Sequence, residues 1–249
     1  MIQYVQSTEL YFSHYDKLDK QSLLGFKGWL IEKYKPKTVN SRILGLNKFL
    51  EFLGKRDMKL KVVKLQQKNF LERVISNADY QFFCNCLKRD NNSHWYFVVR
   101  YLAATGARVS ELIQIKVEHI DMGYIDIYGK GGKVRRVYIP KSLASETKIW
   151  LRQLCKTSGY LFCNRFGSRI TTRGIAHQLK NLATQYGMDT TVVYPHSFRH
   201  RFAKNFLERC SDIALLADLM GHDSIETTRI YLRRTATEQK EMVDSIVDW

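Results

Sequence analysis

The chain has 249 residues, 45% of them hydrophobic and 26% charged, which are ordinary values for a soluble globular protein of one or two domains. It carries 40 Lys and Arg against 24 Asp and Glu, and the resulting net charge of +16 favours a polyanionic partner, above all nucleic acid. An acidic membrane surface is the weaker alternative. No apolar run reaches the roughly 20 residues of a membrane-spanning helix, so we expect no membrane partner.

The five cysteines do not have the spacing of a zinc site, and only Cys84 and Cys86 lie close together. With no signal peptide at the start of the chain, we interpret them as reduced thiols of a cytoplasmic protein.

The first third of the chain is densely basic and its pattern predicts helices. Residues 1–75 carry 15 basic and 7 acidic residues. Residues 23–34 are amphipathic, and a second helical pattern lies between Pro36 and Gly54. Its expected core positions are Val39, Ile43, Leu46, Phe49 and Leu53. We expect residues 1–75 to form a small helical bundle with a basic surface.

Residues 76–249 are predicted to form the larger domain. Ser76 is a candidate N-cap for a helix that runs through Leu87, and residues 94–105 are apolar enough for a buried helix. Residues 124–128 and 136–139 alternate in the manner of strands, and a glycine-rich basic tip joins them into a hairpin. The fold class we predict is therefore mainly α with a small antiparallel β-sheet (α+β).

The C-terminal part returns to helical patterns. Ser211 and Ser224 are candidate N-caps, and Gly221 follows a predicted helix end. A last helix is expected from Thr237, with Met242, Ile246 and Trp249 on one apolar face.

Four short blocks of sequence stand out, and they occur in a fixed order. They are residues 104–112 (Ala-Thr-Gly-Ala-Arg-Val-Ser-Glu-Leu), the hairpin tip at 129–133, residues 195–200 (Pro-His-Ser-Phe-Arg-His) and residues 220–231, which begin Met-Gly-His and end Ile-Tyr. In this order the blocks resemble those of the phage integrase, or tyrosine recombinase, family. The resemblance covers nearly the whole chain: residues from about 80 to 235 are similar to the family's catalytic domain, and residues 1–75 to its helical core-binding domain.

The resemblance implies a site-specific recombinase that cuts and rejoins duplex DNA through a 3′-phosphotyrosyl intermediate. Two arginines would hold the phosphate, one histidine would act as base and another would hydrogen-bond the phosphate, a hairpin lysine would be the general acid, and a tyrosine the nucleophile. By this resemblance, the arginines are Arg108 and Arg199, the base is His196, and the histidine that bonds to the phosphate is His222. The general acid is Lys130 and the nucleophile is Tyr231. Lys133 lies on the same hairpin and remains an alternative to Lys130.

The chemistry of phosphodiester cleavage agrees with these residue types. Guanidinium groups match phosphate geometry and stay charged. Near pH 7 only about one tyrosine in a thousand is ionised, and changing this balance costs roughly 4 kcal/mol, which two arginines and a histidine base can supply. His196 and Arg199 are three residues apart, so a helix places both on one face. Each residue alone has an ordinary structural interpretation; together they predict an active site.

Other residues receive weaker interpretations. Glu111 is expected to support a neighbouring element, and His200 to pack beside the site. Arg42, Lys48 and Lys133 are candidate DNA contacts, with a solvated helix face as an equal alternative for the first two. Many family members have glycine where this chain has Cys210, which would be strained if its φ were positive.

The phosphotyrosyl bond conserves the energy of the broken diester, so we expect no nucleotide, metal or other cofactor. The expected partners are double-stranded DNA and accessory DNA-bending proteins. We also expect the chain to form a homotetramer on DNA, with the C-terminal helix making the contact between subunits. Docking of that helix on its own domain is the alternative. Because the bundle starts almost at Met1, we expect a simple resolvase, invertase or small mobile-element integrase without an arm-binding domain. A type IB topoisomerase-like enzyme and a catalytically silent DNA-binding regulator are the competing hypotheses.

Overall fold

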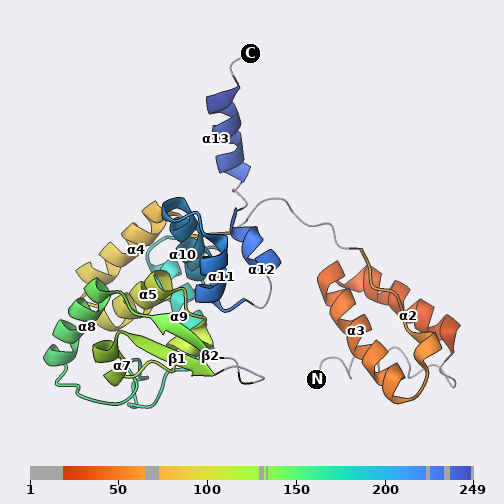
Figure 1. Ribbon diagram of the computed structural model, residues 1–249, viewed down its shortest axis with the longest axis horizontal. Coiled ribbons are helices and arrows are strands. Elements are labelled where there is room, and N and C mark those ends of the chain that lie inside the picture. Colours follow the sequence, from red (N-terminus) through yellow and green to blue (C-terminus); the bar gives the residue numbers. More distant parts are fainter. Residues whose placement is uncertain are drawn as a thin grey trace. The chain divides into compact units, whose positions relative to one another are not determined.

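The computed structural model describes residues 19–64, 73–128, 132, 134–222, 225–232 and 236–247, and the chain divides into two compact units, residues 1–68 and 69–249 (Figure 1). The described residues are mainly α-helical with one two-stranded antiparallel sheet, as predicted. No described helix has the length and apolar character needed to span a membrane. Ile75, which the predicted boundary gave to the first domain, is buried in the core of the larger unit, and its amide donates to Ser197 Oγ at 2.8 Å.

The described part of the first unit, residues 19–64, contains two helices and a short 3-10 turn: α2 (Lys20–Lys33), α3 (Pro36–Phe52) and η1 (Arg56–Met58). Asp19 caps α2 by accepting from the Ser22 amide at 2.7 Å, and Pro36 occupies the first turn of α3, where its missing amide proton costs nothing. The core is apolar and consists of Leu23, Phe26, Leu30, Val39, Ile43, Leu46, Leu50 and Leu60.

The predicted core face of α3 was wrong at its C-terminal end. Leu50 is fully buried, whereas Phe49 is 53% and Leu53 44% exposed. Along a helix the buried stripe advances from Ile43 to Leu46 to Leu50, so the next positions in the predicted register turn toward solvent.

The larger unit contains the remaining elements. These are α4 (Asn77–Arg89), α5 (Ser93–Thr105), α6 (Val109–Leu112), α7 (Glu118–Met122), β1 (Tyr124–Tyr128), β2 (Val134–Tyr138), α8 (Lys141–Gln153), α9 (Thr172–Gln185), α10 (Pro195–Arg209), α11 (Ile213–Met220), α12 (Ile225–Arg229), η3 (Ile230–Leu232) and α13 (Ala236–Ile246).

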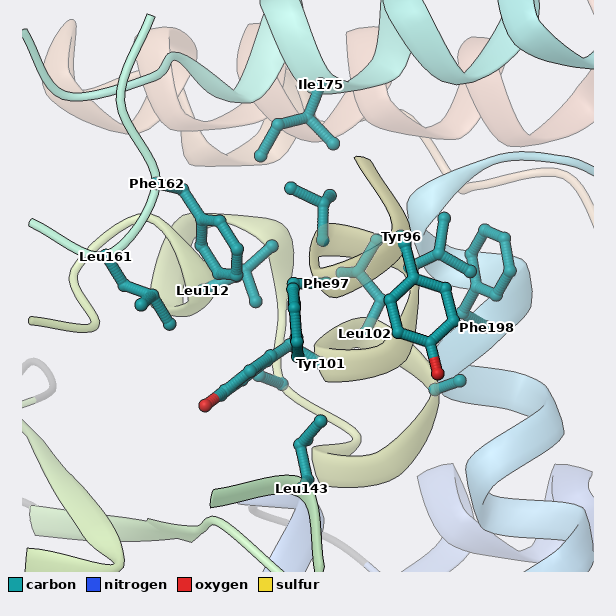
Figure 2. Close-up of a cluster of buried hydrophobic side chains, with 14 of the residues drawn as sticks. Tyr96, Phe97, Tyr101, Leu102, Leu112, Leu143, Leu161, Phe162, Ile175 and Phe198 are labelled. Atoms are coloured by element: carbon teal, nitrogen blue, oxygen red, sulfur yellow. The ribbon is translucent and has the colours of Figure 1, made fainter. Parts of the chain in front are cut away.

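Helix α5 is the centre of this unit, in contact with α4, α8 and α10. Its sequence is apolar around most of its circumference, as expected for a helix that is covered on several sides. Figure 2 shows Tyr96, Phe97, Tyr101 and Leu102 of α5 among side chains from the surrounding elements, including Phe162, Ile175 and Phe198. The Tyr101 hydroxyl is satisfied by Thr147 Oγ1 at 3.0 Å. This packed core fixes the start of α6 and the α10 face that carries the site residues.

The caps of these helices test several predictions. Ser76 caps α4 by accepting from the Asp79 amide at 3.0 Å, as predicted. Helix α11 is capped by Asp212, not by Ser211, because the Asp212 carboxylate accepts from the Leu215 amide at 2.9 Å. Gly221 ends α11 in the left-handed conformation, as predicted. Cys210 has φ −139°, so the strain considered for it is not present. Ser224 lies outside the described residues.

The hairpin is confirmed, with Tyr124 opposite Tyr138 and Tyr128 opposite Val134. Its second strand begins at Val134, two residues before the predicted start. Strand β2 contacts α11, which ties the hairpin to the elements that follow α10.

Candidate active site

Arg108 enters the site from the junction of α5 and α6. Helix α5 ends at Gly106 with φ +60°, and a Cβ there would lie 2.4 Å from the Phe202 ring, so only glycine fits. The turn makes Arg108 the residue before α6, where Glu111 accepts its amide at 2.7 Å and its Nη1 at 2.8 Å. The Arg108 side chain is 42% exposed, so it combines fixed geometry with access to a ligand.

Arg199 is the most deeply buried charge of the site, with 1% exposure. It donates to Gly106 O at 2.6 Å, to Met220 O at 2.5 Å and to His222 Nε2 at 3.1 Å. All of these acceptors are neutral. Burial, followed by repulsion from Arg108 and Arg135, lowers the Arg199 pKa to about 10. The cation thus keeps its charge at neutral pH without a direct carboxylate partner in the described chain.

Three arginines from different elements converge on the C-terminal end of α11. Arg135 Nε donates to Leu219 O at 2.8 Å, Arg199 to Met220 O, and Arg108 Nη2 to Gly221 O at 2.9 Å. The last carbonyls of a helix lack partners within the helix and form its negative end, so cations are favourable there. The arrangement places the next residue, His222, beside all three arginines.

Glu111 lies beneath the arginines and is 4% exposed. It accepts from Arg108 and from Arg135 Nη1. Burial raises its pKa, but the hydrogen bonds and charges of Arg135 and Arg108 outweigh burial and hold the pKa below the ordinary glutamate value. Glu111 is therefore a carboxylate that supports Arg108, in agreement with the role predicted for it.

His222 is held between Arg199 and Thr228. Since an arginine cannot accept a hydrogen bond, His222 Nε2 is the acceptor, and its Nδ1 then carries the proton and donates to Thr228 Oγ1 at 2.8 Å. Burial, followed by the charges of Arg199, Arg108 and Arg135, lowers the His222 pKa to about 4. His222 is therefore neutral near pH 7.

Tyr231 lies in η3 and is 3% exposed. Its ring stacks on His222, with centroids 6.0 Å apart, and meets the His200 ring edge-on at 5.1 Å. Burial raises the Tyr231 pKa, and Arg199 and Arg108 oppose that rise. The two arginines predicted to hold the phosphate thus also favour the phenolate.

His196 and His200 complete this side of the site, one helical turn apart on α10 with ring centroids 4.5 Å apart. His196 is exposed, while His200 is half-buried between His196 and Tyr231. Loss of water around the packed side of the ring, followed by the charges of Arg199 and Arg108, lowers the His196 pKa. Burial, then the charges of His196 and Arg199, lowers the His200 pKa to about 4. A neutral His196 is suited to accept a proton.

The structure thus brings together Arg108, His196, Arg199, His222 and Tyr231 from separate parts of the sequence. Lys130 and Lys133 lie outside the described residues, between strands β1 and β2. In the first unit, Arg42 stacks on the Tyr34 ring at 3.7 Å, and Lys48 pairs with Glu51 at 3.3 Å. Within the described ranges, no three His, Cys, Asp or Glu residues are grouped so as to hold a metal ion.

Two residues of the site were not predicted. Arg135 is one of two adjacent arginines on a strand, and the alternation of β2 shows only that one of them points inward. Thr228 is fully buried beneath His222 and lies three residues before Tyr231. Its position inside the last sequence block was the available signal.

Comparison with known proteins identifies the family of this fold and site. The model of the phage integrase family matches residues 68–238. Tyrosine recombinase XerA of Pyrococcus furiosus is 30% identical over 217 residues, which cover 85% of this chain and 74% of that protein. Tyrosine recombinase XerD of Oceanobacillus iheyensis is 29% identical over 248 residues, covering 93% of this chain and 83% of that protein.

Solved structures show the same fold. The XerH site-specific recombinase bound to palindromic difH substrate, in a post-cleavage complex, superimposes with a TM-score of 0.75 at 21% identity and covers 97% of this chain and 77% of that one. The XerA recombinase crystal structure gives a TM-score of 0.59 at 22% identity, with 98% and 90% covered. Together, the family match, the relatives and the converged site lead to one conclusion: the chain belongs to the phage integrase family and is a tyrosine-type site-specific recombinase, an enzyme that cleaves and rejoins DNA.

Proposed function

We propose that Tyr231 is the nucleophile that attacks the scissile phosphate held by Arg108 and Arg199. The new bond joins the tyrosine oxygen to phosphorus and the bond to the 5′ oxygen breaks, which leaves a 3′-phosphotyrosyl link and a free 5′-hydroxyl. His196 accepts the phenolic proton, and Lys130, or Lys133 in its place, donates a proton to the leaving oxygen. The observation that carries the proposal is the convergence of the two arginines and Tyr231 around His222.

His222 changes its hydrogen-bond role during this step. Its Nε2 accepts from Arg199 in the DNA-free protein, so it cannot donate to a phosphate in that state. A phosphate that takes over the Arg199 donor also adds negative charge, which raises the His222 pKa from its value of about 4. His222 then holds a proton on Nε2 and donates it to a non-bridging oxygen.

The two units divide the work on DNA. We assign catalysis to residues 76–249 and DNA clamping to the helical bundle of residues 1–75, a core-binding domain. Arg42, Lys48 and Lys133 contact phosphates of the duplex, which contributes affinity but little sequence choice. The five free cysteines fit the cytoplasmic location that we propose. The type of recombinase that we propose is a mobile-element integrase, a resolvase or an invertase.

We further propose that four copies assemble on DNA through α13, with accessory DNA-bending proteins as additional partners. The described apolar side chains of α13 are exposed, Val243 by 56% and Ile246 by 58%, and so is Val247 directly after the helix, by 42%. The larger unit also has a groove of about 400 Å³ that combines aromatic and basic side chains, namely Tyr80, Phe202, Phe206, Arg100, Arg201 and Arg209. Apolar and acidic residues of a neighbouring α13, such as Ile246 and Asp244, complement this lining.

The assembly is tested by measuring the mass of the protein–DNA complex. Ile246→Asp and Phe206→Asp each reduce the tetramer to smaller complexes, because each places a charge in the apolar contact. Phe166→Asp, at a side chain that is 75% exposed, leaves the tetramer intact. Tetramers that persist in both test variants contradict α13 docking in this groove.

The catalytic proposal is tested by covalent trapping on nicked duplexes tiled across the DNA that flanks the gene, with excess chelator and no nucleotide. The wild type and Tyr128→Phe, a control at a tyrosine that is 79% exposed, give a protein–DNA band that survives denaturant. Tyr231→Phe gives none. A band that persists in Tyr231→Phe, or no band on any duplex despite binding, contradicts the proposal. Relaxation of supercoiled plasmid without a partner site supports the topoisomerase hypothesis instead.

A further inference from the structure

Arg135 is a buried cation that none of the roles assigned so far uses. It lies on β2, its side chain is 10% exposed, and it reaches two other elements. Its Nη1 donates to the carboxylate of Glu111 in α6, and its Nε donates to Leu219 O near the end of α11. One planar group therefore joins the hairpin to both the element that supports Arg108 and the turn that carries His222.

The contact between Arg135 and Glu111 is needed to keep the buried Glu111 carboxylate ionised. The Glu111 side chain is 6% exposed, and its two oxygens are shared between Arg108 and Arg135. A buried carboxylate is stable as an anion only when it is paired and hydrogen-bonded. Arg108 also has to serve a ligand from its partly exposed position, so Arg135 is the partner that keeps Glu111 charged throughout the reaction.

Arg135 also packs closely against the turn that ends α11. Gly221 has φ +60°, and a Cβ on it would lie 2.2 Å from Arg135 Cδ. The aliphatic part of Arg135 thus packs directly against the backbone that precedes His222. Arg136, the next residue on the strand, instead pairs with Asp126 of β1 at 2.8 Å and its side chain is 43% exposed. The two neighbours have equal charge and different environments.

We propose that Arg135 is a positioning residue of the recombination reaction: it sets Arg108, through Glu111, and His222, through the 219–221 turn, in their relative places without contacting DNA. The inference rests on the proposed roles of Arg108 and His222. It predicts that loss of Arg135 slows strand cleavage while leaving DNA affinity almost unchanged.

The test compares Arg135→Gln and Arg135→Lys with Arg136→Gln as the matched control. Single-turnover cleavage is measured on a nicked duplex that traps the wild type, and affinity is measured on the same duplex. Arg135→Gln slows cleavage by up to about 100-fold, because small displacements of catalytic groups have effects of that size. Arg135→Lys rescues little, since one ammonium cannot reproduce the two directed bonds of a guanidinium. Arg136→Gln cleaves at the wild-type rate.

The pH profile separates positioning from general destabilisation. The groups that face Glu111 are Arg108 of the α6 start, Arg135 of β2 and, at longer range, Arg199 of α10. Without Arg135, Glu111 takes up its proton at a higher pH. Ionised Glu111 supports Arg108 only above the Glu111 pKa. The acid limb of the plot of cleavage rate against pH therefore moves to higher pH in Arg135→Gln. The double variant with Glu111→Gln has no such shift, because the carboxyl group that causes it is absent.

Several outcomes overturn the proposal. One is a wild-type rate and profile in Arg135→Gln. Another is a loss of DNA affinity with full rescue by Arg135→Lys, which indicates a phosphate contact. If no duplex traps the wild type, the proposed function has failed. The inference is then decided by thermal unfolding of the larger unit, where Arg135→Gln must be less stable than the wild type near neutral pH, and by more than Arg136→Gln is. That difference must shrink as the solution is acidified, because the stabilisation that ionised Glu111 gains from Arg135 is lost as Glu111 of the wild type is protonated.

Discussion

The first unit keeps its charge at the surface, whereas the larger unit buries part of its charge around the active site. In the first unit, Lys48 is 84% exposed and its partner Glu51 32%, above a core of apolar side chains. In the larger unit, Arg199 is 1% and Glu111 4% exposed. Exposed cations move freely and are screened by salt, so they contribute affinity. Buried ions are held in one geometry, which costs stability and contributes to the rate of reaction.

The largest effect in this comparison is expected for Arg199→Lys. A lysine keeps the positive charge but cannot donate to Gly106 O, Met220 O and a phosphate in the directions that the guanidinium uses. We expect single-turnover cleavage to slow by on the order of 100- to 1000-fold. Arg152→Lys, at an exposed arginine of α8, is the control and retains the rate. If the cleavage rate of Arg199→Lys stays within a few-fold of the wild-type rate, the fixed geometry of the buried guanidinium does not contribute to the reaction.

An intermediate effect is expected for the pH dependence of stability. His200 and His222 have pKa values of about 4 in the folded protein, below the ordinary histidine value near 6.5. Between these two pH values the unfolded chain binds more protons than the folded one, so stability falls as pH decreases from about 6.5 to about 4. Scanning calorimetry on the larger unit's transition measures this loss.

His222→Gln removes one of the groups that titrate in this range and therefore makes the decline with pH shallower. His177→Gln, at an exposed histidine of α9, is the matched control. An equally steep decline in His222→Gln would show that the buried site is not its source.

The smallest effect is expected for Lys48→Gln in the first unit. Loss of one phosphate contact lowers the slope of log affinity against log salt by about 0.9 and leaves the cleavage rate at saturating protein unchanged. Lys148→Gln is a suitable control because this residue of the larger unit is also ion-paired, to Asp121 at 2.7 Å. An unchanged salt slope would identify Lys48 as part of a solvated helix face.

The sequence predicted local features of the fold more reliably than contacts between distant elements. Ser76 as an N-cap and Gly221 as a helix end depend on a few neighbouring residues, and both are confirmed. The burial of Leu50 in place of Leu53 depends on how α3 meets α2, which periodicity alone leaves open by about one turn.

In the candidate site too, features encoded in short stretches of sequence were predicted, and contacts between distant residues were not. The sequence blocks identified the residues that the structure brings together, from Arg108 to Tyr231. Arg135 was not predicted, because its partners Glu111 and Leu219 are 24 and 84 residues away and become neighbours only in the folded chain. Lys130 and Lys133 stay predictions.

The row of carbonyls at the end of α11 has a consequence for how folding and DNA binding depend on each other. The Nη atoms of Arg199 donate to neutral acceptors, its Nε is buried without a partner, and no carboxylate pairs with it directly among the described residues. In the reaction that we propose, the scissile phosphate supplies this anionic partner. Substrate therefore completes the charge balance of the fold, and part of the free energy of DNA binding becomes free energy of folding of the larger unit.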